Sequence, residues 1–156
     1  MRLRFEINPR DRPSIEAITR STGFFSEAEV AIALSVFDEA LADPKAGYHY
    51  ALAEQEGMVV GYACWGRDPQ TRSSYELYWI AVDSRCRSAG VGSLLLASVE
   101  AYVVEHGHGQ LYIETAGRQQ YEPTRSFYEH KGYVQAAWLA DYFAPGDARV
   151  IYTKRL

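Results

Sequence analysis

The sequence predicts an α/β fold in which a mixed, mostly antiparallel twisted sheet carries one parallel strand–helix–strand crossover and has helices on both faces. The first observation is the run 77–115, where an apolar strand, a glycine-containing loop, a helix and a second strand follow one another. This order produces a right-handed crossover between parallel neighbours. The second observation is that short turns join the other strand segments, as in antiparallel hairpins. The third is a pair of amphipathic helices with clear start signals near the N-terminus.

The chain begins with one expected strand and one short helix. Residues 3–7 read as the strand. Residues 13–20 read as the helix, with Asp11 or Arg12 near its cap and Gly23 beyond its end. This segment therefore places a first helix directly after the first strand.

The second helix has the clearest start of any element. Ser26 and Glu29 form a capping box, and Phe25 with Val30 fits a hydrophobic staple. The apolar residues then recur at helical spacing on one face: Val30, Leu34, Phe37 and Leu41. The helix is expected to end before Pro44, because proline disfavours helical geometry in the residue that precedes it.

Three strands are expected after this helix. Residues 48–54 and 58–65 form two β segments separated by the Glu56-Gly57 turn. Residues 74–82 form the next strand, which is apolar on both faces from residue 77 onward. Such a pattern suits a central strand that is covered on two sides.

The helix after the glycine loop begins near Val91 and stops at Gly107, as a glycine after a helix C-terminus would require. Its expected apolar face consists of Val91, Leu94, Leu95, Val99, Tyr102 and Val103. Residues 111–115 form the strand that completes the crossover.

The last quarter predicts one helix and a hairpin. Pro123 opens the helix and Gly132 closes it, which follows the usual preference for proline at helix starts and glycine at helix ends. Residues 133–140 and 149–154 form two final strands around the Pro145-Gly146 turn. The complete predicted order is βααβββαβαββ.

Length and composition indicate one soluble domain spanning residues 1–156. The chain has 156 residues, of which 47% are hydrophobic and 23% charged, so a full-sized core is expected and disorder is not. No apolar run approaches the roughly 18 residues of a membrane span. The N-terminus lacks the apolar core of a signal peptide. We therefore expect a cytoplasmic protein that does not associate with membranes.

Charge and potential ligand residues narrow the function classes further. The net charge of −4 disfavours a general role in nucleic-acid binding. A polyanionic ligand would need local cations, which Arg85 and Arg87 are expected to supply. The two cysteines lack metal-site spacing, and His106 and His108 lack an evident third ligand. No metal is expected.

The most informative stretch is Arg87-Ser88-Ala89-Gly90-Val91-Gly92, which lies between an apolar strand and a helix start. Glycines let backbone N–H groups converge, and the helix start adds roughly half a positive charge, so an anion such as a diphosphate would sit well there. A Walker loop is excluded because its Gly-x-x-x-x-Gly-Lys-Ser/Thr string does not occur. A Rossmann loop is disfavoured because Leu95 occupies the third glycine position and no βαβ unit precedes the loop.

A second motif, Phe127-Tyr128-Glu129-His130-Lys131-Gly132-Tyr133, follows in the chain. The Arg-x-x-Gly-x-Gly loop and this helix motif together resemble the two signatures of the GNAT-type N-acetyltransferases, in family order and at family spacing. The resemblance spans nearly the whole chain. It implies the acyl-CoA N-acyltransferase fold and acetyl-CoA as co-substrate.

The resemblance also implies a set of residues that bind acetyl-CoA. Pyrophosphate is expected on the backbone N–H groups of Ser88, Ala89, Gly90, Val91, Gly92 and Ser93, with Arg87 at the family's Gln/Arg position. Pantetheine and the reaction's oxyanion are expected on the backbone of Ile80, Ala81 and Val82. The family often has Asn seven residues before the helix tyrosine, and here Tyr121 stands there beside Gln120. Either side chain substitutes for the Asn, or the contact is absent.

Two residues are expected to carry the chemistry. By resemblance, Tyr128 is the general acid that protonates the departing thiolate, although it also fits as a core residue beside Phe127. Glu76 lies fourteen residues before Gly90. In the histone-acetyltransferase branch of the family a strand glutamate at this spacing is the base, so the resemblance implies Glu76 as the first candidate for the base that deprotonates the amine. It would need burial to raise its proton affinity, or it would act through a water. Glu114 is the second candidate, and a water chain without a dedicated base is the third.

The expected function is transfer of an acetyl group from acetyl-CoA directly to a primary amine in a ternary complex. No covalent acetyl-enzyme is expected, because neither cysteine lies at a plausible nucleophile position. The alternatives are a non-catalytic acyl-CoA-binding sensor or partner domain and a structural protein that binds no CoA. The acceptor is a small-molecule or peptide amine that the sequence does not identify, and the resemblance makes a homodimer an option.

Overall fold

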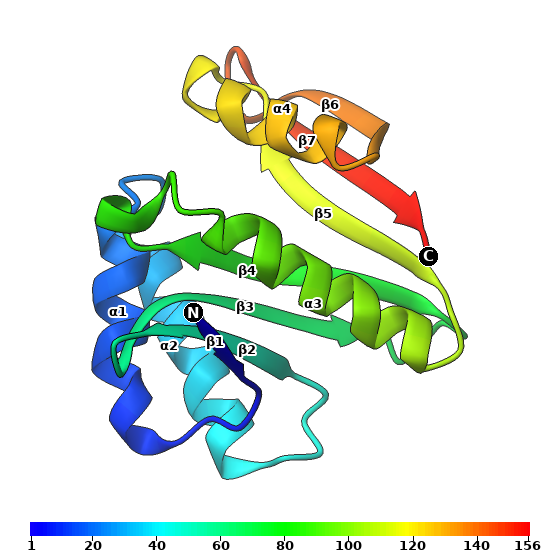
Figure 1. The fold of residues 1–156 in the computed structure, drawn as a ribbon. Coiled ribbons are helices and arrows are strands. Elements are labelled where there is room, and N and C mark those ends of the chain that lie inside the picture. Colours follow the sequence, from blue (N-terminus) through cyan, green and yellow to red (C-terminus); the bar gives the residue numbers. More distant parts are fainter. The chain divides into compact units, whose positions relative to one another are not determined.

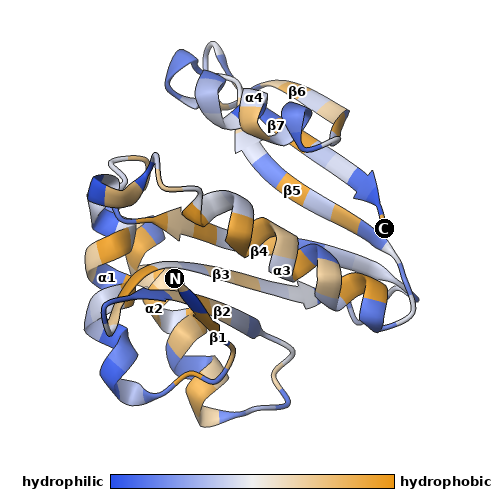
Figure 2. Cartoon of the chain, in the orientation of Figure 1, coloured by the Kyte–Doolittle hydropathy of each residue, from blue (hydrophilic) through white to orange (hydrophobic).

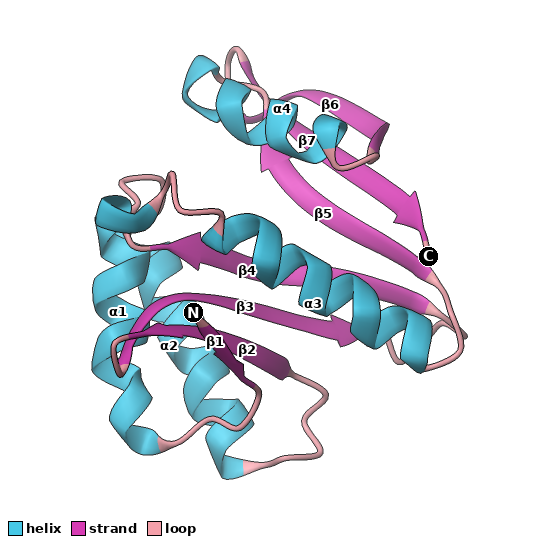
Figure 3. Ribbon diagram, viewed as in Figure 1, coloured by secondary structure: helices cyan, strands magenta, loops and turns pink.

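Seven strands and four helices follow one another in the predicted order βααβββαβαββ, with three short 3-10 helices between them. The computed structural model describes residues 1–156 (Figure 1). The strands are β1 (Arg2–Arg4), β2 (His49–Gln55), β3 (Met58–Arg67), β4 (Ser74–Val82), β5 (Gln110–Ala116), β6 (Val134–Ala144) and β7 (Asp147–Arg155). The helices are α1 (Arg12–Ser21), α2 (Glu27–Ala42), α3 (Val91–Glu105) and α4 (Glu122–His130) (Figure 3).

The strands form one sheet in the order β1-β2-β3-β4-β5-β7-β6. The pairing of β4 with β5 is parallel, whereas β1 with β2, β2 with β3, β5 with β7 and β6 with β7 are antiparallel. The predicted fold class, a mixed sheet with one parallel crossover, is confirmed. The chain divides into two compact units. The first unit consists of Met1–Gly66 and Tyr78–Tyr102, and the second consists of Arg67–Leu77 and Val103–Leu156. Strand β4 therefore contributes residues to both units.

In the first unit, alternate residues of β2 and β3 face different helices, as the two-residue period of a strand requires. One face carries a buried cluster with α1 and α2, which includes Ile15, Ile18, Phe37, Tyr50, Leu52, Tyr62 and Cys64. On the other face, a Cβ added to Gly61 would lie 2.9 Å from Val91 Cγ1 of α3. Gly61 therefore permits close packing of α3, whose hydrophobic residues recur along its length (Figure 2). Helices on both faces of the sheet are confirmed for this unit.

The capping signals of the first two helices are largely confirmed. The Ser26 side chain accepts a hydrogen bond from the Glu29 N–H at 3.2 Å, and the Glu29 carboxylate accepts one from the Ser26 N–H at 3.2 Å. The staple residue Phe25 packs against Trp79, with ring centroids 5.2 Å apart. Asp11 occupies the N-cap position of α1, but its carboxylate accepts hydrogen bonds from the Arg4 guanidinium instead of capping the helix.

In the second unit, one face of the sheet is packed and the other is open. Buried side chains alternate along β4, β5 and β7: Tyr75, Leu77, Leu111, Ile113, Ala148, Val150 and Tyr152. Helix α4 covers this face, since Tyr128 contacts Tyr152 with ring centroids 6.2 Å apart. The intervening residues Glu76 and Glu114 are exposed, and no helix of this unit covers them.

Three expectations, about the first strand, α3 and β4, are wrong. The first strand is Arg2–Arg4 and not residues 3–7, because the Arg4 side chain turns back to donate to the Glu6 carbonyl oxygen. In α3, Leu94 is 37% exposed whereas Leu96 is buried, because the buried face follows residues 91, 95, 99 and 103. Strand β4 is central, but Tyr78 is 38% exposed, so its second half is not covered on both sides.

The final hairpin is longer than the sequence predicts. Strand β6 continues to Ala144 and β7 starts at Asp147. The turn is tight because Gly146 adopts a φ of +80° and its N–H donates to the Asp141 carboxylate at 2.7 Å. None of the helices is both long enough and apolar enough to cross a membrane.

Candidate functional site

The glycine loop connects the end of β4 to the start of α3 within the first unit. After Val82 the chain forms a 3-10 helix, Ser84–Cys86, and α3 begins at Val91. Gly90 has a φ of +76°, a backbone conformation that side-chain-bearing residues rarely adopt, and a Cβ added there would meet no atom within 4 Å. The positive φ at position 90 favours glycine, and no atom of the protein fills the space that a Cβ would occupy there. The N-terminal N–H groups of α3 have no partner within the helix, which suits this end for an anion.

Asp83 shapes the start of the loop, a role that the sequence analysis did not assign. Its N–H donates to the Val60 carbonyl oxygen of β3 at 2.8 Å. Its carboxylate accepts hydrogen bonds from the Arg85 backbone N–H at 2.9 Å and from Arg85 Nη2 at 2.7 Å. These hydrogen bonds lower the pKa of Asp83 to about 2. Arg85, one of the two expected cations, is therefore paired with Asp83, which offsets its charge.

Arg87 is the loop cation that is not matched to a carboxylate. Its Nη2 donates to the Thr22 carbonyl oxygen, and its Cζ lies 5.6 Å from the centre of the Phe24 ring. The loop is further attached at Ser84, whose N–H donates to the Ser21 hydroxyl at 3.2 Å. The loop is thus held by the segment between α1 and α2, although Thr22 and Arg87 lie 65 residues apart in the sequence.

The end of β4 contains the residues predicted to face pantetheine. Ala81 is buried, and Ile80 and Val82 are half-buried. The parallel ladder pairs Ser74–Leu77 of β4 with residues 110–113 of β5, and β4 continues beyond it to Val82. A role for these backbone groups toward pantetheine or the oxyanion stays a prediction.

Tyr128 lies on α4 in the second unit and is only 3% exposed. Its ring contacts those of Phe127, Tyr133 and Tyr152, with centroid distances of 5.3, 5.8 and 6.2 Å. Burial raises the pKa of the Tyr128 phenol above its ordinary value. The phenol therefore keeps its proton at neutral pH, in surroundings made largely of other aromatic rings.

Tyr121 immediately precedes α4, at the end of the short 3-10 helix Gln119–Tyr121. Its side chain is half-buried, and the Arg118 guanidinium lies 4.5 Å from the centre of its ring. Arg125 Nη1 donates to the carbonyl oxygens of Ala116 at 2.7 Å and Arg118 at 3.1 Å, which fixes this connection. The position of the family Asn is thus occupied by an aromatic ring stacked on an arginine.

The two base candidates lie on the opposite face of the second unit's sheet from Tyr128. Glu76 of β4 pairs with Tyr112 of β5. Ile113, which follows Tyr112 in β5, pairs with Tyr152 under α4. Because side chains alternate along a strand, Glu76 and Glu114 share the open face and Tyr128 covers the other. Glu114 accepts a hydrogen bond from Arg149 Nη2 at 3.0 Å, whereas Glu76 forms no ion pair. The structure therefore does not give Glu76 the burial that a direct base would need.

No group of three or more His, Cys, Asp or Glu side chains is placed to hold a metal ion. His106 is exposed after the end of α3, and His108 has a φ of +67° in the turn that leads to β5. These histidines belong to a turn in the structure.

Comparison with known proteins gives a consistent result. The model of the acetyltransferase (GNAT) family matches residues 13–133. A crystal structure from Desulfovibrio desulfuricans, described as an acetyltransferase of the GNAT family, is 38% identical with a TM-score of 0.95, covering 99% of this chain and 98% of that one. The ribosomal-protein-alanine N-acetyltransferase of Brucella melitensis shares the fold at 22% identity, with a TM-score of 0.78 and complete coverage of both chains.

Another structure with the same fold is an aminoglycoside 6'-N-acetyltransferase complexed with coenzyme A. It is 17% identical with a TM-score of 0.78, covering 99% of this chain and 97% of that one. Among curated relatives, an uncharacterized N-acetyltransferase of Methanocaldococcus jannaschii is 28% identical over 68% of this chain. A mycothiol acetyltransferase of Acidimicrobium ferrooxidans is 36% identical over 54% of it. The matched segments span 65% and 27% of those two relatives' lengths.

Proposed function

Because the chain belongs to the GNAT acetyltransferase family, we propose that it transfers an acetyl group from acetyl-CoA directly to a primary amine within a ternary complex. The observation that carries this proposal is the glycine loop before α3. Gly90 has the positive φ and the open space that an anion cradle needs, and Arg87 beside it has no carboxylate partner. In a protein with a net charge of −4, this loop combines a helix N-terminus with an arginine that has no carboxylate partner, which suits it for an anion.

Acetyl-CoA would be held by the backbone at two places. Its diphosphate would accept hydrogen bonds from the N–H groups of residues 88–93, with Arg87 adding a full positive charge. Its pantetheine arm would pair with the backbone of β4 at residues 80–82, in the manner of an added strand. The fold shared with a coenzyme A complex supports this assignment. Tyr121 would take the place of the family Asn beside the arm.

The reaction requires one bond to form and one to break. The neutral amine nitrogen attacks the thioester carbonyl carbon and forms a tetrahedral intermediate with a positive nitrogen and an oxyanion. The nitrogen loses one proton to water, and collapse of the oxyanion breaks the C–S bond to give the amide and a thiolate. Tyr128 would donate a hydrogen bond, and finally its proton, to the thiolate. Because burial raises the pKa of this phenol, a complete proton transfer to a thiolate is uphill. The hydrogen bond to the developing negative charge is then the larger contribution of Tyr128.

The amine nitrogen must lose a proton before or during its attack, because alkylamines are mostly protonated at neutral pH. We assign this step to Glu76 acting through a water, since its exposed carboxylate is in contact with solvent. Glu114 is the weaker candidate because it is already bound to Arg149. Because the sheet of the second unit separates Glu76 from Tyr128, Glu76 would deprotonate the ammonium through water before the attack, whereas Tyr128 would act later on the thiolate.

Direct transfer is supported by the state of the two cysteines. Cys64 is buried in the core of the first unit, and burial raises the pKa of its thiol to about 12. Such a thiol is a poor nucleophile at neutral pH. Cys86 lies in the 3-10 helix ahead of the glycine loop, at the diphosphate end of the proposed site. Neither thiol is suited to carry the acetyl group.

The acceptor belongs to the class of small-molecule or peptide amines. Relatives and structural neighbours are named for a ribosomal protein, an aminoglycoside and mycothiol. Their shared chemistry is an amine acceptor, and we extend only that class to this chain. A cytoplasmic location is also part of the proposal, and a homodimer stays the option that the family resemblance raises.

The proposal is tested by measuring thiol release from acetyl-CoA with a panel of primary amines that includes amino acids, polyamines, aminoglycosides and short peptides. We expect amine-dependent release of one equivalent of CoA per amide formed, with no burst of acetylated protein. A wild-type protein that binds acetyl-CoA but acetylates no member of the panel would indicate the alternative, a non-catalytic acyl-CoA-binding domain. A stable acetyl-protein that forms in the absence of amine would contradict direct transfer.

A further inference from the structure

We propose that Phe24 is a positioning residue for Arg87, so that the segment between α1 and α2 forms part of the diphosphate-binding site. We call residues 21–24 the α1–α2 corner. This inference rests on the proposed use of acetyl-CoA and adds a residue to that site. The glycine-loop motif does not include Phe24, and Phe24 precedes Arg87 by more than sixty positions in the sequence.

Three contacts join the α1–α2 corner to the loop. Arg87 Nη2 donates to the Thr22 carbonyl oxygen, and the guanidinium lies over the Phe24 ring with Cζ 5.6 Å from its centre. The Ser84 N–H donates to the Ser21 hydroxyl at 3.2 Å. The corner therefore contacts both ends of the segment 84–87 and fixes the direction of its arginine.

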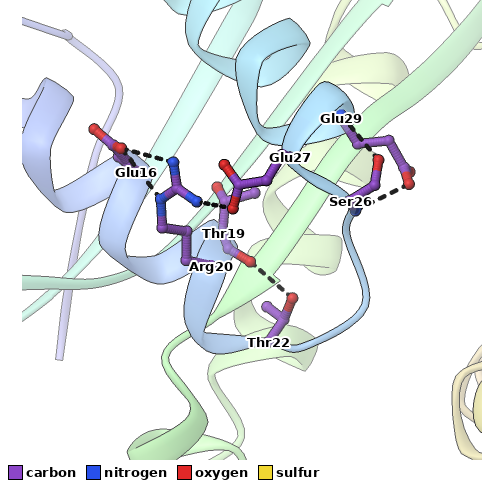
Figure 4. Close-up of polar contacts among 7 residues, drawn as sticks. All are labelled: Glu16, Thr19, Arg20, Thr22, Ser26, Glu27 and Glu29. Atoms are coloured by element: carbon purple, nitrogen blue, oxygen red, sulfur yellow. Dashed lines mark hydrogen bonds and ion pairs between the residues drawn. The ribbon is translucent and has the colours of Figure 1, made fainter.

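The α1–α2 corner is itself held in place by side chains from both helices (Figure 4). Arg20 binds Glu16 of α1 at 3.1 Å and also binds Glu27 at the start of α2. The Thr22 hydroxyl donates to the Thr19 carbonyl oxygen at 2.9 Å and accepts from the Phe24 N–H at 3.3 Å. Phe24 and the Thr22 carbonyl thus belong to a segment that hydrogen bonds and ion pairs connect to α1 and to the start of α2.

The geometry leaves Arg87 able to bind an anion while it is held. A guanidinium has five N–H donors in a planar fork, and the hydrogen bond to Thr22 uses one nitrogen. Arg87 Cζ lies over the Phe24 ring, and this cation–π contact does not use the hydrogen-bond donors that a phosphate would need. An arginine already fixed in one rotamer loses less conformational entropy when a phosphate binds. The ring should therefore increase diphosphate affinity through Arg87.

A double-mutant cycle tests this coupling, with coenzyme A affinity measured by titration calorimetry on the full chain. Phe24→Leu should weaken binding about two- to fivefold, the effect of a cation–π contact at an exposed site. In the Arg87→Gln background the same substitution should have no further effect. Phe24→Tyr, which keeps a ring under the guanidinium, should restore wild-type affinity. Pantetheine, which lacks the diphosphate, should bind all variants equally.

Phe25→Leu is the matched control because Phe25 is the neighbouring ring but packs against Trp79. Phe25→Leu should lower the stability of the fold. Its effect on coenzyme A affinity should be the same whether residue 87 is Arg or Gln. The inference is overturned if Phe24→Leu weakens binding equally in both backgrounds, if it tightens binding, or if Phe24→Tyr fails to restore it. The free energy of unfolding of the same variants is also measured without ligand. If the losses of Phe24→Leu and Arg87→Gln simply add in the double variant, the two residues are not coupled and the inference is also overturned. Absence of coenzyme A binding by the wild-type protein would instead reject the proposed function.

Discussion

The glycine loop of the first unit and the α4 region of the second differ in what holds their functional residues. At the loop, a positive backbone φ at Gly90 and polar contacts from Asp83 and Thr22 set the geometry, and Arg87 stays exposed. At α4, packed aromatic rings surround Tyr128, which is 3% exposed. A residue held by backbone conformation can be recognised from a short motif. A residue held by packing has a role that depends on the whole fold.

A second contrast lies within the second unit, between the buried Tyr128 and the exposed Glu76. The sheet separates them, because Glu76 pairs with Tyr112 on the open face while Tyr152 contacts Tyr128 on the other. A buried hydrogen-bond donor interacts strongly with a developing charge, whereas an exposed carboxylate is screened by water. We therefore expect substitutions at the two residues to differ in size.

The largest effect is expected at Tyr128. Tyr128→Phe should lower turnover at least tenfold and change acetyl-CoA affinity less than twofold, because the thiolate loses its hydrogen-bond donor while the loop is untouched. Tyr152→Phe is the matched control, since it removes a hydroxyl that donates to Glu129 at 2.7 Å in the same aromatic cluster. Steady-state kinetics with a responsive amine measure both variants. Wild-type turnover in Tyr128→Phe would reject Tyr128 as the acid.

A smaller effect is expected at Glu76. Glu76→Gln should lower turnover about two- to tenfold at neutral pH, because water can partly replace an exposed base. Raising the pH should reduce the difference, since more of the amine is then already neutral. Glu114→Gln, which removes the other carboxylate of the same face, should change turnover less than twofold. If Glu114→Gln has the larger effect, the assignment of the base must be reversed.

At Asp83 the effect is on stability and depends on pH. The hydrogen bonds from Arg85 lower the pKa of Asp83 to about 2 in the folded protein, below its value in the unfolded chain. A lowered carboxylate pKa stabilises the fold above about pH 4, and this contribution is lost as the pH falls toward 2. Because Arg85 is exposed, we expect only about 1 kcal/mol. Urea unfolding of Asp83→Asn should show this loss at pH 7 and a much smaller one near pH 2, and a pH-independent loss would contradict it.

The smallest effect is expected for Arg20, which supports the α1–α2 corner through exposed ion pairs with Glu16 and Glu27. Arg20→Gln should lower Tm by no more than about 2 °C at low ionic strength. The difference should disappear in 1 M salt, because exposed charges are then screened. Thermal unfolding at both salt concentrations measures it. A loss that persists in high salt would show that Arg20 acts through packing instead.

Features that depend on nearby residues could be predicted from the sequence. The Ser26–Glu29 capping box, the glycine loop and the parallel crossover depend on residue types at fixed short spacings, and all three are present. The exposure of Glu76 between the buried Tyr75 and Leu77 follows from the two-residue period of a strand, and is therefore also a local feature. The neutralisation of Arg85 by Asp83 could also have been inferred, since the two residues are two positions apart.

Features that depend on distant residues could not be predicted in this way. No local pattern places Phe24 against Arg87, because the contact exists only when the α1–α2 corner and the loop fold together. The separation of Tyr128 from Glu76 by the sheet requires the strand registers of β4, β5 and β7. A hydropathy pattern does not show that the first strand ends at Arg4, because the Arg4 side chain binds Glu6, Asp11 and Glu54.

The most direct test of the central claim is thermal unfolding with and without acetyl-CoA for three proteins: wild type, Gly90→Glu and Gly57→Glu. The two glycines have φ values of +76° and +80°, and neither has an atom within 4 Å of an added Cβ, so backbone strain and charge are matched. At a ligand concentration of 100 times Kd, we expect a stabilisation of about 2.7 kcal/mol, or several degrees, for wild type and Gly57→Glu and none for Gly90→Glu. An unchanged Tm for wild type, or an equal shift in both variants, would contradict acetyl-CoA binding at this loop.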